Sequence, residues 1–214
     1  MGMNVLITGA AGFIGSNFVY WLLQNATNTI SKIVVLDSLT YAGNYATIKP
    51  LVDKGEIVFV KGDIRDAVLI DKIIKNESIS HIINFAAESH VDRSIENPLS
   101  FVETNVVGTQ VLLNSSLRAG IERYIQISTD EVYGSLGPTG RFSESTPLDP
   151  SSAYSASKTG ADLLVLAQHR THGQNVCVTR CSNNYGPYQF PEKLIPLFVT
   201  NALSDKSLPV YGDG

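Results

Sequence analysis

The feature that most constrains the fold is a glycine-rich turn near the N-terminus. An apolar run from Met3 to Thr8 ends in three regularly spaced glycines, Gly9, Gly12 and Gly15, and residues 16–24 then follow helical spacing. A strand, a glycine turn and a helix in this order begin a β-α-β unit. Such a turn can bring the backbone close to a pyrophosphate at the helix N-terminus, although glycines that serve only packing are the alternative.

Further apolar runs extend this pattern along the chain. They are nearly continuous rather than alternating, which is typical of parallel strands buried on both faces. These strands alternate along the chain with segments of helical periodicity. We therefore expect an α/β fold with a doubly wound parallel sheet of the Rossmann type and ligands beyond the carboxyl ends of its strands. The expected strands cover residues 32–36, 56–61, 81–85, 123–127 and 176–179, and the expected helices cover residues 66–75, 98–120 and 152–172.

Polar or small residues follow these strands where a cofactor would lie. Asp37 ends the second strand, where an acid binds a ribose hydroxyl pair and repels a 2'-phosphate, so NAD is favoured over NADP. Asp63 and Ile64 follow the third strand and suit an adenine, with a helix N-cap as the alternative for Asp63. Ala86 and Ala87 follow the fourth strand and are small enough to let a flat cofactor pass, or to serve helix packing.

A proton-handling group is expected where the fifth strand ends. Thr129 lies there, and Tyr154 and Lys158 lie four residues apart on one face of the next helix. The lysine charge is expected to lower the pKa of the tyrosine from its ordinary value of about 10. A surface tyrosine beside a lysine is the alternative.

Asp130 and Glu131 separate the possible reactions. Neighbouring residues of a strand point to opposite faces, so both carboxyls can serve one substrate only if the chain leaves the strand there. Ketone reduction or epimerisation requires no such pair, whereas elimination of water requires one group to remove a carbon-bound proton and another to protonate the leaving hydroxyl. A solvated acidic turn is the alternative.

Size and composition narrow the remaining classes. The 214 residues suffice for one well-buried domain with a small second lobe, and 43% of them are hydrophobic. The net charge of −4 disfavours nucleic acids and anionic membranes as partners. We see no secretory leader and no run of about eighteen apolar residues, so no membrane span is expected.

The histidines and cysteines predict neither a metal site nor a disulfide. His81, His90, His169 and His172 lack a ligand arrangement around them. The two cysteines, at 177 and 181, are expected in one strand, where four residues span roughly 13 Å, beyond the limit of about 7 Å for a disulfide. We therefore expect reduced thiols and a cytoplasmic location.

Longer motifs support a resemblance to a known family. Together they resemble the extended short-chain dehydrogenase/reductases and, within that family, the enzymes that dehydrate the sugar of dTDP-glucose. The likeness covers essentially the whole chain. The motifs are GAAGFIG, DSLTYAGN from Asp37, AAESHVDRSI from Ala86, STDEVYG, YSASK, and NNYGPY from Asn183, followed by PEKLIP.

The resemblance implies a lyase that works in three stages on a nucleotide-linked hexose. Tyr154 would take the C4 hydroxyl proton during oxidation by NAD, with Thr129 bonded to that oxygen. Glu131 would remove the C5 proton while Asp130 protonates the departing C6 hydroxyl. Reduction at C6 would give a 4-keto-6-deoxy sugar for deoxysugar pathways such as that of rhamnose.

The resemblance also implies contacts and a partner. A homodimer would form through the helices near residues 98–119 and 152–172. With the glycine turn and Ala86 included, the expected cofactor-binding residues are Gly9, Gly12, Phe13, Ile14, Gly15, Asp37, Ser38, Leu39, Thr40, Asp63, Ile64, Ala86, Ala87, Thr104, Tyr154, Lys158 and Asn184. The expected substrate-binding residues are Ser89, Thr129, Asp130, Glu131, Asn183, Lys193, Leu194, Pro209 and Tyr211.

Two units are expected, a cofactor domain over residues 1–180 and the beginning of a substrate lobe over residues 181–214. Because family members continue further, we expect a fragment that binds NAD but turns over slowly or not at all. Epimerases and decarboxylases of the same scaffold lack the paired carboxyls and are disfavoured. A dehydratase of a GDP-, CDP- or UDP-sugar and a non-catalytic NAD-binding module remain alternatives.

Overall fold

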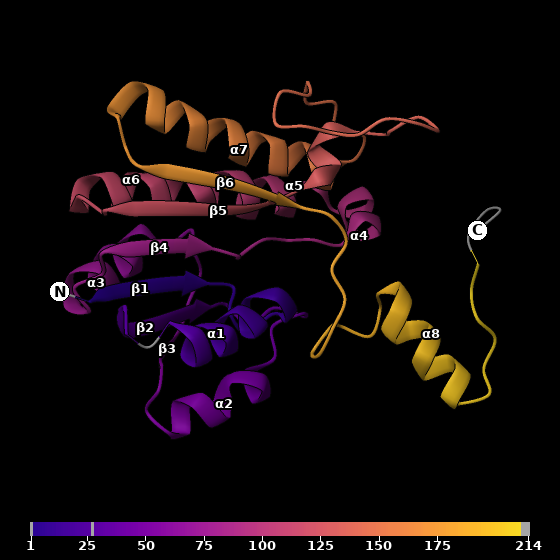
Figure 1. Ribbon diagram of the computed structural model, residues 1–214, viewed down its shortest axis with the longest axis horizontal. Helices are drawn as coiled ribbons and strands as arrows, with labels where there is room; N and C mark the ends of the chain where they lie inside the picture. The colour runs from indigo at the N-terminus through magenta and orange to yellow at the C-terminus, as the bar shows by residue number, and fades with distance from the viewer. Residues whose placement is uncertain (1, 27, 211–214) are drawn as a thin grey trace.

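The fold is a single parallel sheet with helices on both faces (Figure 1), as seen in a computed structural model that describes residues 2–26 and 28–210. The strand order is β3-β2-β1-β4-β5-β6, so the chain reverses direction across the sheet between β1 and β4. This order confirms the doubly wound α/β prediction. The strands are β1 (Met3–Thr8), β2 (Ile30–Asp37), β3 (Val58–Lys61), β4 (His81–Asn84), β5 (Arg123–Thr129) and β6 (Val176–Cys181).

The helices divide between the two faces of the sheet. Along β1, Val5 and Ile7 pack with α1 and α2, whereas Leu6 between them packs with α3, α6 and α7. Both faces are therefore apolar, which explains the continuous apolar runs. The helices are α1 (Phe13–Asn25), α2 (Tyr45–Asp53), α3 (Ala67–Asn76), α4 (Val91–Glu96), α5 (Pro98–Phe101), α6 (Thr109–Ala119), α7 (Ala153–His172) and α8 (Leu194–Leu203), with a π-helix η1 (Val102–Gly108) and a 3-10 helix η2 (Asp130–Tyr133).

The long helix expected over residues 98–120 differs most from the prediction. It contains a π-helical segment, η1, at whose centre the buried Asn105 accepts a hydrogen bond from the Glu88 N–H at 2.9 Å and donates to the Ser157 hydroxyl at 2.8 Å. These bonds join η1 to the loop after β4 and to α7. The interruption thus follows from long-range polar contacts, and π-helical turns are frequent at functional sites.

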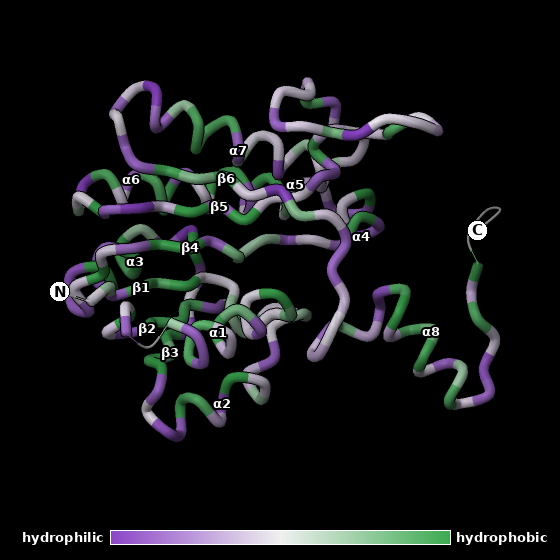
Figure 2. The backbone as a smooth tube through the Cα atoms, in the orientation of Figure 1, coloured by the Kyte–Doolittle hydropathy of each residue, from purple (hydrophilic) through white to green (hydrophobic). Residues whose placement is uncertain are grey.

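The segment after β6 extends away from the sheet and leads into α8 (Figure 1). Apolar residues lie along α8 (Figure 2), and Leu194, Val199 and Leu203 are at least half exposed. The division into units at residues 180 and 181 stays a prediction. No helix within the described residues is long and apolar enough to span a membrane.

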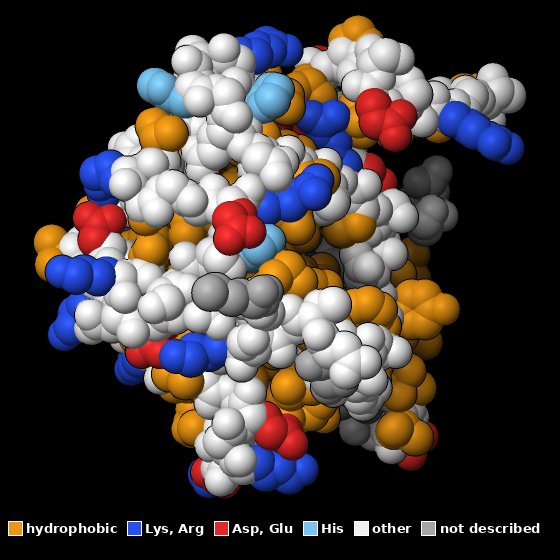
Figure 3. Space-filling model, turned by 60° about the vertical axis from the view of Figure 1, so that its left-hand side comes forward, with side chains coloured by type: hydrophobic (Ala, Val, Ile, Leu, Met, Phe, Trp, Pro, Cys, Tyr) orange, Lys and Arg blue, Asp and Glu red, His pale blue; other side chains and the backbone are white. Residues whose placement is uncertain are grey.

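The visible surface has no gathered basic region. On the face shown in Figure 3, lysine and arginine side chains alternate with aspartate and glutamate side chains. The cysteines are both free thiols on β6, as expected. Among the described residues no group of three or more histidine, cysteine or acidic side chains is placed to hold a metal ion.

Candidate active site

A cleft of about 710 Å³ lies along the carboxyl ends of the strands. This size suits a small-molecule site. The residues that line it come from the glycine turn, from the loops after β2, β3, β4 and β6, from η1 and from α7. The topology therefore brings together most residues that the sequence assigned to a cofactor and a sugar nucleotide.

The glycine turn is held against the end of β4. Gly9 has a φ of +69°, and a Cβ there would lie 2.5 Å from the Ala86 nitrogen. At Gly15 a Cβ would lie 2.6 Å from the Gly9 oxygen. Gly12 caps α1 without a side-chain hydrogen bond, so the first turn of that helix offers its N–H groups to the cleft. These are the features of a pyrophosphate cradle.

Asp37 has a structural task in addition to its expected one. Its carboxylate is 7% exposed and accepts hydrogen bonds from the Ala11 N–H at 2.9 Å and the Leu39 N–H at 2.8 Å. Burial raises its pKa, although the two N–H groups act in the opposite direction. The side chain lines the cleft while it braces the glycine turn. Each carboxylate oxygen has a further lone pair that could accept a hydrogen bond from a ribose hydroxyl. That contact stays a prediction.

The Asp63 carboxylate binds Arg65 and does not cap a helix. Arg65 donates to the Asp63 carboxylate from Nε and Nη2, at 2.7 to 3.1 Å, and this pairing lowers the pKa of Asp63. The N-cap of α3 is Asp66, which accepts from the Leu69 N–H at 3.0 Å. The helix-cap alternative for Asp63 is therefore wrong. Asp63 and Ile64 both line the cleft.

Tyr154 and Lys158 lie in the cleft on the first turns of α7, and both side chains are nearly buried. Burial raises the pKa of Tyr154, and the neighbouring Glu131 charge raises it further, while the Thr129 hydroxyl lowers it. The Lys158 ammonium donates to the Ile127 carbonyl at 2.7 Å. In the protein without cofactor the pKa of Tyr154 is thus raised, mainly by burial, and the lowering by Lys158 stays a prediction for the NAD-bound site.

The chain leaves β5 at the acidic pair, as the dehydration hypothesis requires. Asp130 and Glu131 begin η2, and the Thr129 hydroxyl accepts from the Glu131 N–H at 3.2 Å. Glu131 lines the cleft, and burial raises its pKa, followed by the Asp130 charge, whereas Lys193 lowers it. The Asp130 carboxylate is 3.4 Å from the Thr129 hydroxyl, and Asp130 is not among the residues that line the cleft. The two carboxyls are therefore not equivalent.

The expected substrate residues divide into two groups. The cleft lining includes Ser89, Asn183, Lys193 and Leu194. Pro209 lies beyond α8 and does not line the cleft, and Tyr211 is outside the described residues. The expected cofactor-binding residues line the cleft with one exception. Leu39 lies outside the lining, and its N–H donates a hydrogen bond to Asp37. The residues that line the cleft are Gly9, Gly12, Phe13, Ile14, Gly15, Asp37, Ser38, Thr40, Asp63, Ile64, Ala86, Ala87, Thr104, Tyr154, Lys158 and Asn184.

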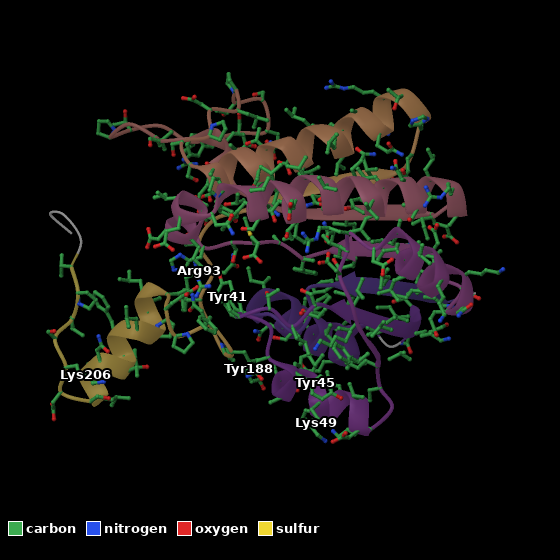
Figure 4. All side chains as sticks on the ribbon, turned by 180° about the vertical axis from the view of Figure 1, so that it is seen from behind. Tyr41, Tyr45, Lys49, Arg93, Tyr188 and Lys206 are labelled. Carbon is green, nitrogen blue, oxygen red and sulfur yellow. The ribbon has the colours of Figure 1, made fainter. Side chains whose placement is uncertain are left out.

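Sequence reasoning missed a cluster at the wall of the cleft, formed by Tyr41, Arg93, Phe190 and Glu192. The Arg93 guanidinium stacks 3.7 Å from the centre of the Tyr41 ring, and both are labelled in Figure 4. The Phe190 ring contacts the Tyr41 ring edge-on with their centres 5.5 Å apart, and Glu192 lies 3.8 Å from Arg93. Burial raises the pKa of Tyr41 to about 12. The motifs contain Tyr41, Arg93 and Glu192 but not Phe190, and no local spacing links the four residues.

This cluster yields a prediction about cofactor retention. It joins the loop after β2, α4 and the segment after β6 around one wall of the cleft. We expect Arg93→Ala to speed dissociation of NAD by up to about tenfold, since a cation–π contact and an exposed ion pair contribute on the order of 1 kcal/mol. Stopped-flow displacement of NAD measures this rate. Arg118→Ala, which removes an exposed ion pair with Asp71 where β5 begins, is the control and should leave the rate unchanged.

Lys158 yields a prediction about pH. Burial lowers its pKa from 10.5 to about 8, so between these values the unfolded chain binds more protons than the folded one, and stability rises with pH. The free energy of unfolding of the wild type is expected to rise relative to Lys158→Met by up to about 3 kcal/mol across this window. Urea unfolding of both proteins at several pH values measures it. A difference that does not change with pH contradicts the expectation.

Comparison with known proteins supplies the family. The family model described as GDP-mannose 4,6 dehydratase matches residues 6–214. The chain belongs to this dehydratase family. It is 54% identical over 99% of its length to a dTDP-glucose 4,6-dehydratase of Streptomyces antibioticus, of which it covers 62%.

Solved structures share the fold of this chain. The dTDP-glucose 4,6-dehydratase DesIV of Streptomyces venezuelae, crystallised with NAD, matches with a TM-score of 0.95 and 55% identity over 99% of the chain and 66% of DesIV. A UDP-glucose 4-epimerase of Thermotoga maritima matches with a TM-score of 0.89 and 28% identity over 99% of the chain and 67% of the epimerase. The chain thus spans less than two thirds of the length of the Streptomyces antibioticus enzyme and of DesIV.

Proposed function

We propose that the protein dehydrates dTDP-glucose to its 4-keto-6-deoxy derivative with NAD as cofactor. The fold alone does not support this over epimerisation, because a 4-epimerase shares it. The observation that carries the proposal is the acidic turn η2, which places Glu131 in the cleft beside Tyr154, with Asp130 as its neighbour in the turn. Only an elimination has use for both a base and an acid at that point.

The residues of the cleft fit NAD. The glycine turn leaves space that any Cβ would fill, and α1 presents an N-terminus without a capping side chain. Asp37 suits a ribose diol and disfavours a 2'-phosphate, as expected from its position. When bound, NAD would accept a hydride from C4 of the sugar and return it at C6.

The protein's own groups would move the protons. Tyr154 would take the proton of the C4 hydroxyl during oxidation in its ionised form, which the positive charges of Lys158 and of bound NAD would favour, while Thr129 hydrogen-bonds the same C4 oxygen. Glu131 would then remove the C5 proton, which the 4-ketone has made acidic, while Asp130 protonates the C6 hydroxyl so that it leaves as water. Return of the proton from Glu131 to C5 would complete the final reduction. The raised pKa of Glu131 strengthens it as a base for this carbon acid.

The sugar nucleotide would bind at the open side of the cleft. Lys193 supplies a positive charge near Glu131 and suits the diphosphate. Ser89, Asn183 and Leu194 would contact the sugar or its nucleotide, and Pro209 and Tyr211 would follow in the substrate lobe of residues 181–214. Residues 1–180 would form the cofactor domain.

The assembly proposed is a homodimer through the long helices. Leu99 and Val107 on the helix near residues 98–119, and Leu163 on α7, are 47% to 63% exposed, so an apolar face is available there. We further propose a cytoplasmic location and a place in deoxysugar-nucleotide biosynthesis, with rhamnose among the sugars served.

The test is incubation with dTDP-glucose and NAD, followed by alkaline ultraviolet absorbance, which reports a 4-keto sugar. UDP-glucose and GDP-mannose are tested in parallel. Absorbance that develops only slowly with dTDP-glucose is the expected result, in line with the slow turnover expected of this chain. Reaction with GDP-mannose alone would overturn the substrate, and NAD binding without any reaction would favour a binding module over an enzyme.

A further inference from the structure

One arginine joins two catalytic elements from behind the cleft. Arg180 lies on β6, paired in register with Ser128 of β5, and its side chain is 15% exposed. Its Nε donates to the Asp162 carboxylate at 2.9 Å, and its Nη1 donates to the Tyr133 hydroxyl at 2.7 Å. Arg180 does not line the cleft, and the acceptors of its hydrogen bonds are side chains of the protein itself.

The two acceptors belong to the two elements that carry the proposed chemistry. Asp162 lies on α7, one turn after Lys158 and two turns after Tyr154, on the same face of the helix. Tyr133 is the last residue of η2, two positions after Glu131. The Arg180 guanidinium therefore links the helix that carries Tyr154 and Lys158 to the turn that carries Asp130 and Glu131.

The ion pair between Arg180 and Asp162 fixes the geometry of its partners more than it adds to stability. Asp162 is fully buried, and its second oxygen has no hydrogen-bond partner among the described residues. A buried ion pair contributes little net stability compared with an apolar replacement, because both charges lose their hydration. What a planar guanidinium adds is geometry, since its N–H groups point in fixed directions. Both acceptors are thus held at a set separation.

Other contacts also hold η2, since Val132 is fully buried and the Glu131 N–H donates to the Thr129 hydroxyl at the end of β5. The Tyr133 ring stacks on Phe142 of the following loop at 5.1 Å, and the Asp149 N–H donates to the Val132 carbonyl at 3.0 Å. Both partners belong to the irregular segment between η2 and α7. Arg180 adds a side-chain link from the last residue of η2 to Asp162 on α7.

We propose that Arg180 is a positioning residue, which fixes the Asp130–Glu131 turn relative to Tyr154 and Lys158 so that oxidation and elimination occur on one bound sugar. The inference rests on the proposed function for its catalytic consequence. Its structural content, a rigid η2, does not depend on that function.

The variant that isolates the hydrogen bond of this link is Tyr133→Phe, which removes the hydroxyl acceptor but keeps the ring, its stacking on Phe142 and its place 4.9 Å from the Arg180 guanidinium. Arg180→Lys keeps the charge beside Asp162 but loses the planar fork. Arg118→Lys is the matched control, because Arg118 also bonds a carboxylate, that of Asp71, at the opposite end of the sheet. Thermal unfolding first establishes that each variant is folded.

The deciding measurement is hydrogen–deuterium exchange of the η2 amides, including the Gly134 N–H, which bonds the Glu131 carbonyl. We expect roughly tenfold faster exchange there in Tyr133→Phe and Arg180→Lys, because a hydrogen bond to a charged group is lost, and no change in β1. Unchanged exchange in η2, or an equal increase throughout the chain, would overturn the proposal.

The catalytic consequence is read from isotope effects on dTDP-glucose. Deuterium at C5 should slow Tyr133→Phe more than it slows the wild type, because removal of the C5 proton by Glu131 becomes limiting, whereas deuterium at C4 should not. If both proteins turn over and the deuterium isotope effect at C5 is the same in each, Arg180 does not position the base. Absence of turnover in the wild type would count against the proposed function, while amide exchange would still decide the role of Arg180.

Discussion

Glu131→Gln is expected to lower the rate of sugar dehydration by about a thousandfold, within the range of 10² to 10⁴ that a positioned general base contributes. Glutamine keeps the size of the side chain but cannot take the C5 proton. Glu131 lies in the cleft, where burial and the Asp130 charge raise its pKa. Because the base must be ionised, we also expect wild-type activity to fall on acidification at a higher pH than an ordinary glutamate would give.

The measurement is the initial rate of 4-keto sugar formation, with NAD affinity determined separately by calorimetry. NAD affinity should be unchanged, since the carboxylate has no part in the glycine turn. Asp130→Asn should also slow the reaction, at the step in which the hydroxyl leaves. Glu122→Gln, an exposed change just before β5 begins, is the control. A Glu131→Gln protein with more than about a tenth of the wild-type rate would contradict general base catalysis by this residue.

Gly9→Ala is expected to destabilise the fold by roughly 3 kcal/mol or more and to abolish NAD binding. A left-handed backbone costs a side chain about 1 kcal/mol. At Gly9 the added Cβ would also lie 2.5 Å from the nitrogen and 2.7 Å from the Cα of Ala86, which belong to rigid backbone at the end of β4. Either the glycine turn or the β4 loop must move, and both line the cofactor cleft.

The chain offers a matched control for this change. Gly55 has a φ of +70°, against +69° at Gly9, but a Cβ there meets nothing within 4 Å. Gly55→Ala should therefore show the backbone cost alone, about 1 kcal/mol by urea unfolding, with NAD affinity intact. Equal losses in the two variants would mean that close contact with Ala86 is not what requires glycine at position 9.

The regular part of the fold was predictable because its signals are local. Buried strands appear as apolar runs, and α7 begins where predicted because Ser152 and Ser155 form a capping box. The helix α2 was missed, as it is short, contains Pro50 and begins at Asn44, whose cap gives little signal on its own. The π-helix in the middle of the predicted long helix was missed because Asn105 bonds residues far away in the sequence.

The same distinction applies to the site. The glycine turn and the Tyr154 and Lys158 pair have fixed spacings and could be predicted as neighbours. The unequal placement of Asp130 and Glu131 could not, because it depends on where β5 ends and on how η2 turns. Arg93 and Arg180 contact residues more than forty positions away, Tyr41 and Tyr133 respectively, so only the folded chain identifies them.

The strand order has a consequence for synthesis on the ribosome. The first strand to emerge, β1, is a central strand, and its partner β4 is made only after β2 and β3. Until residues 81–84 leave the exit tunnel, one edge of β1 remains unpaired, and an open apolar edge is a template for association with other chains. A pause in translation between β3 and β4 is therefore the interval in which the nascent chain most needs a chaperone.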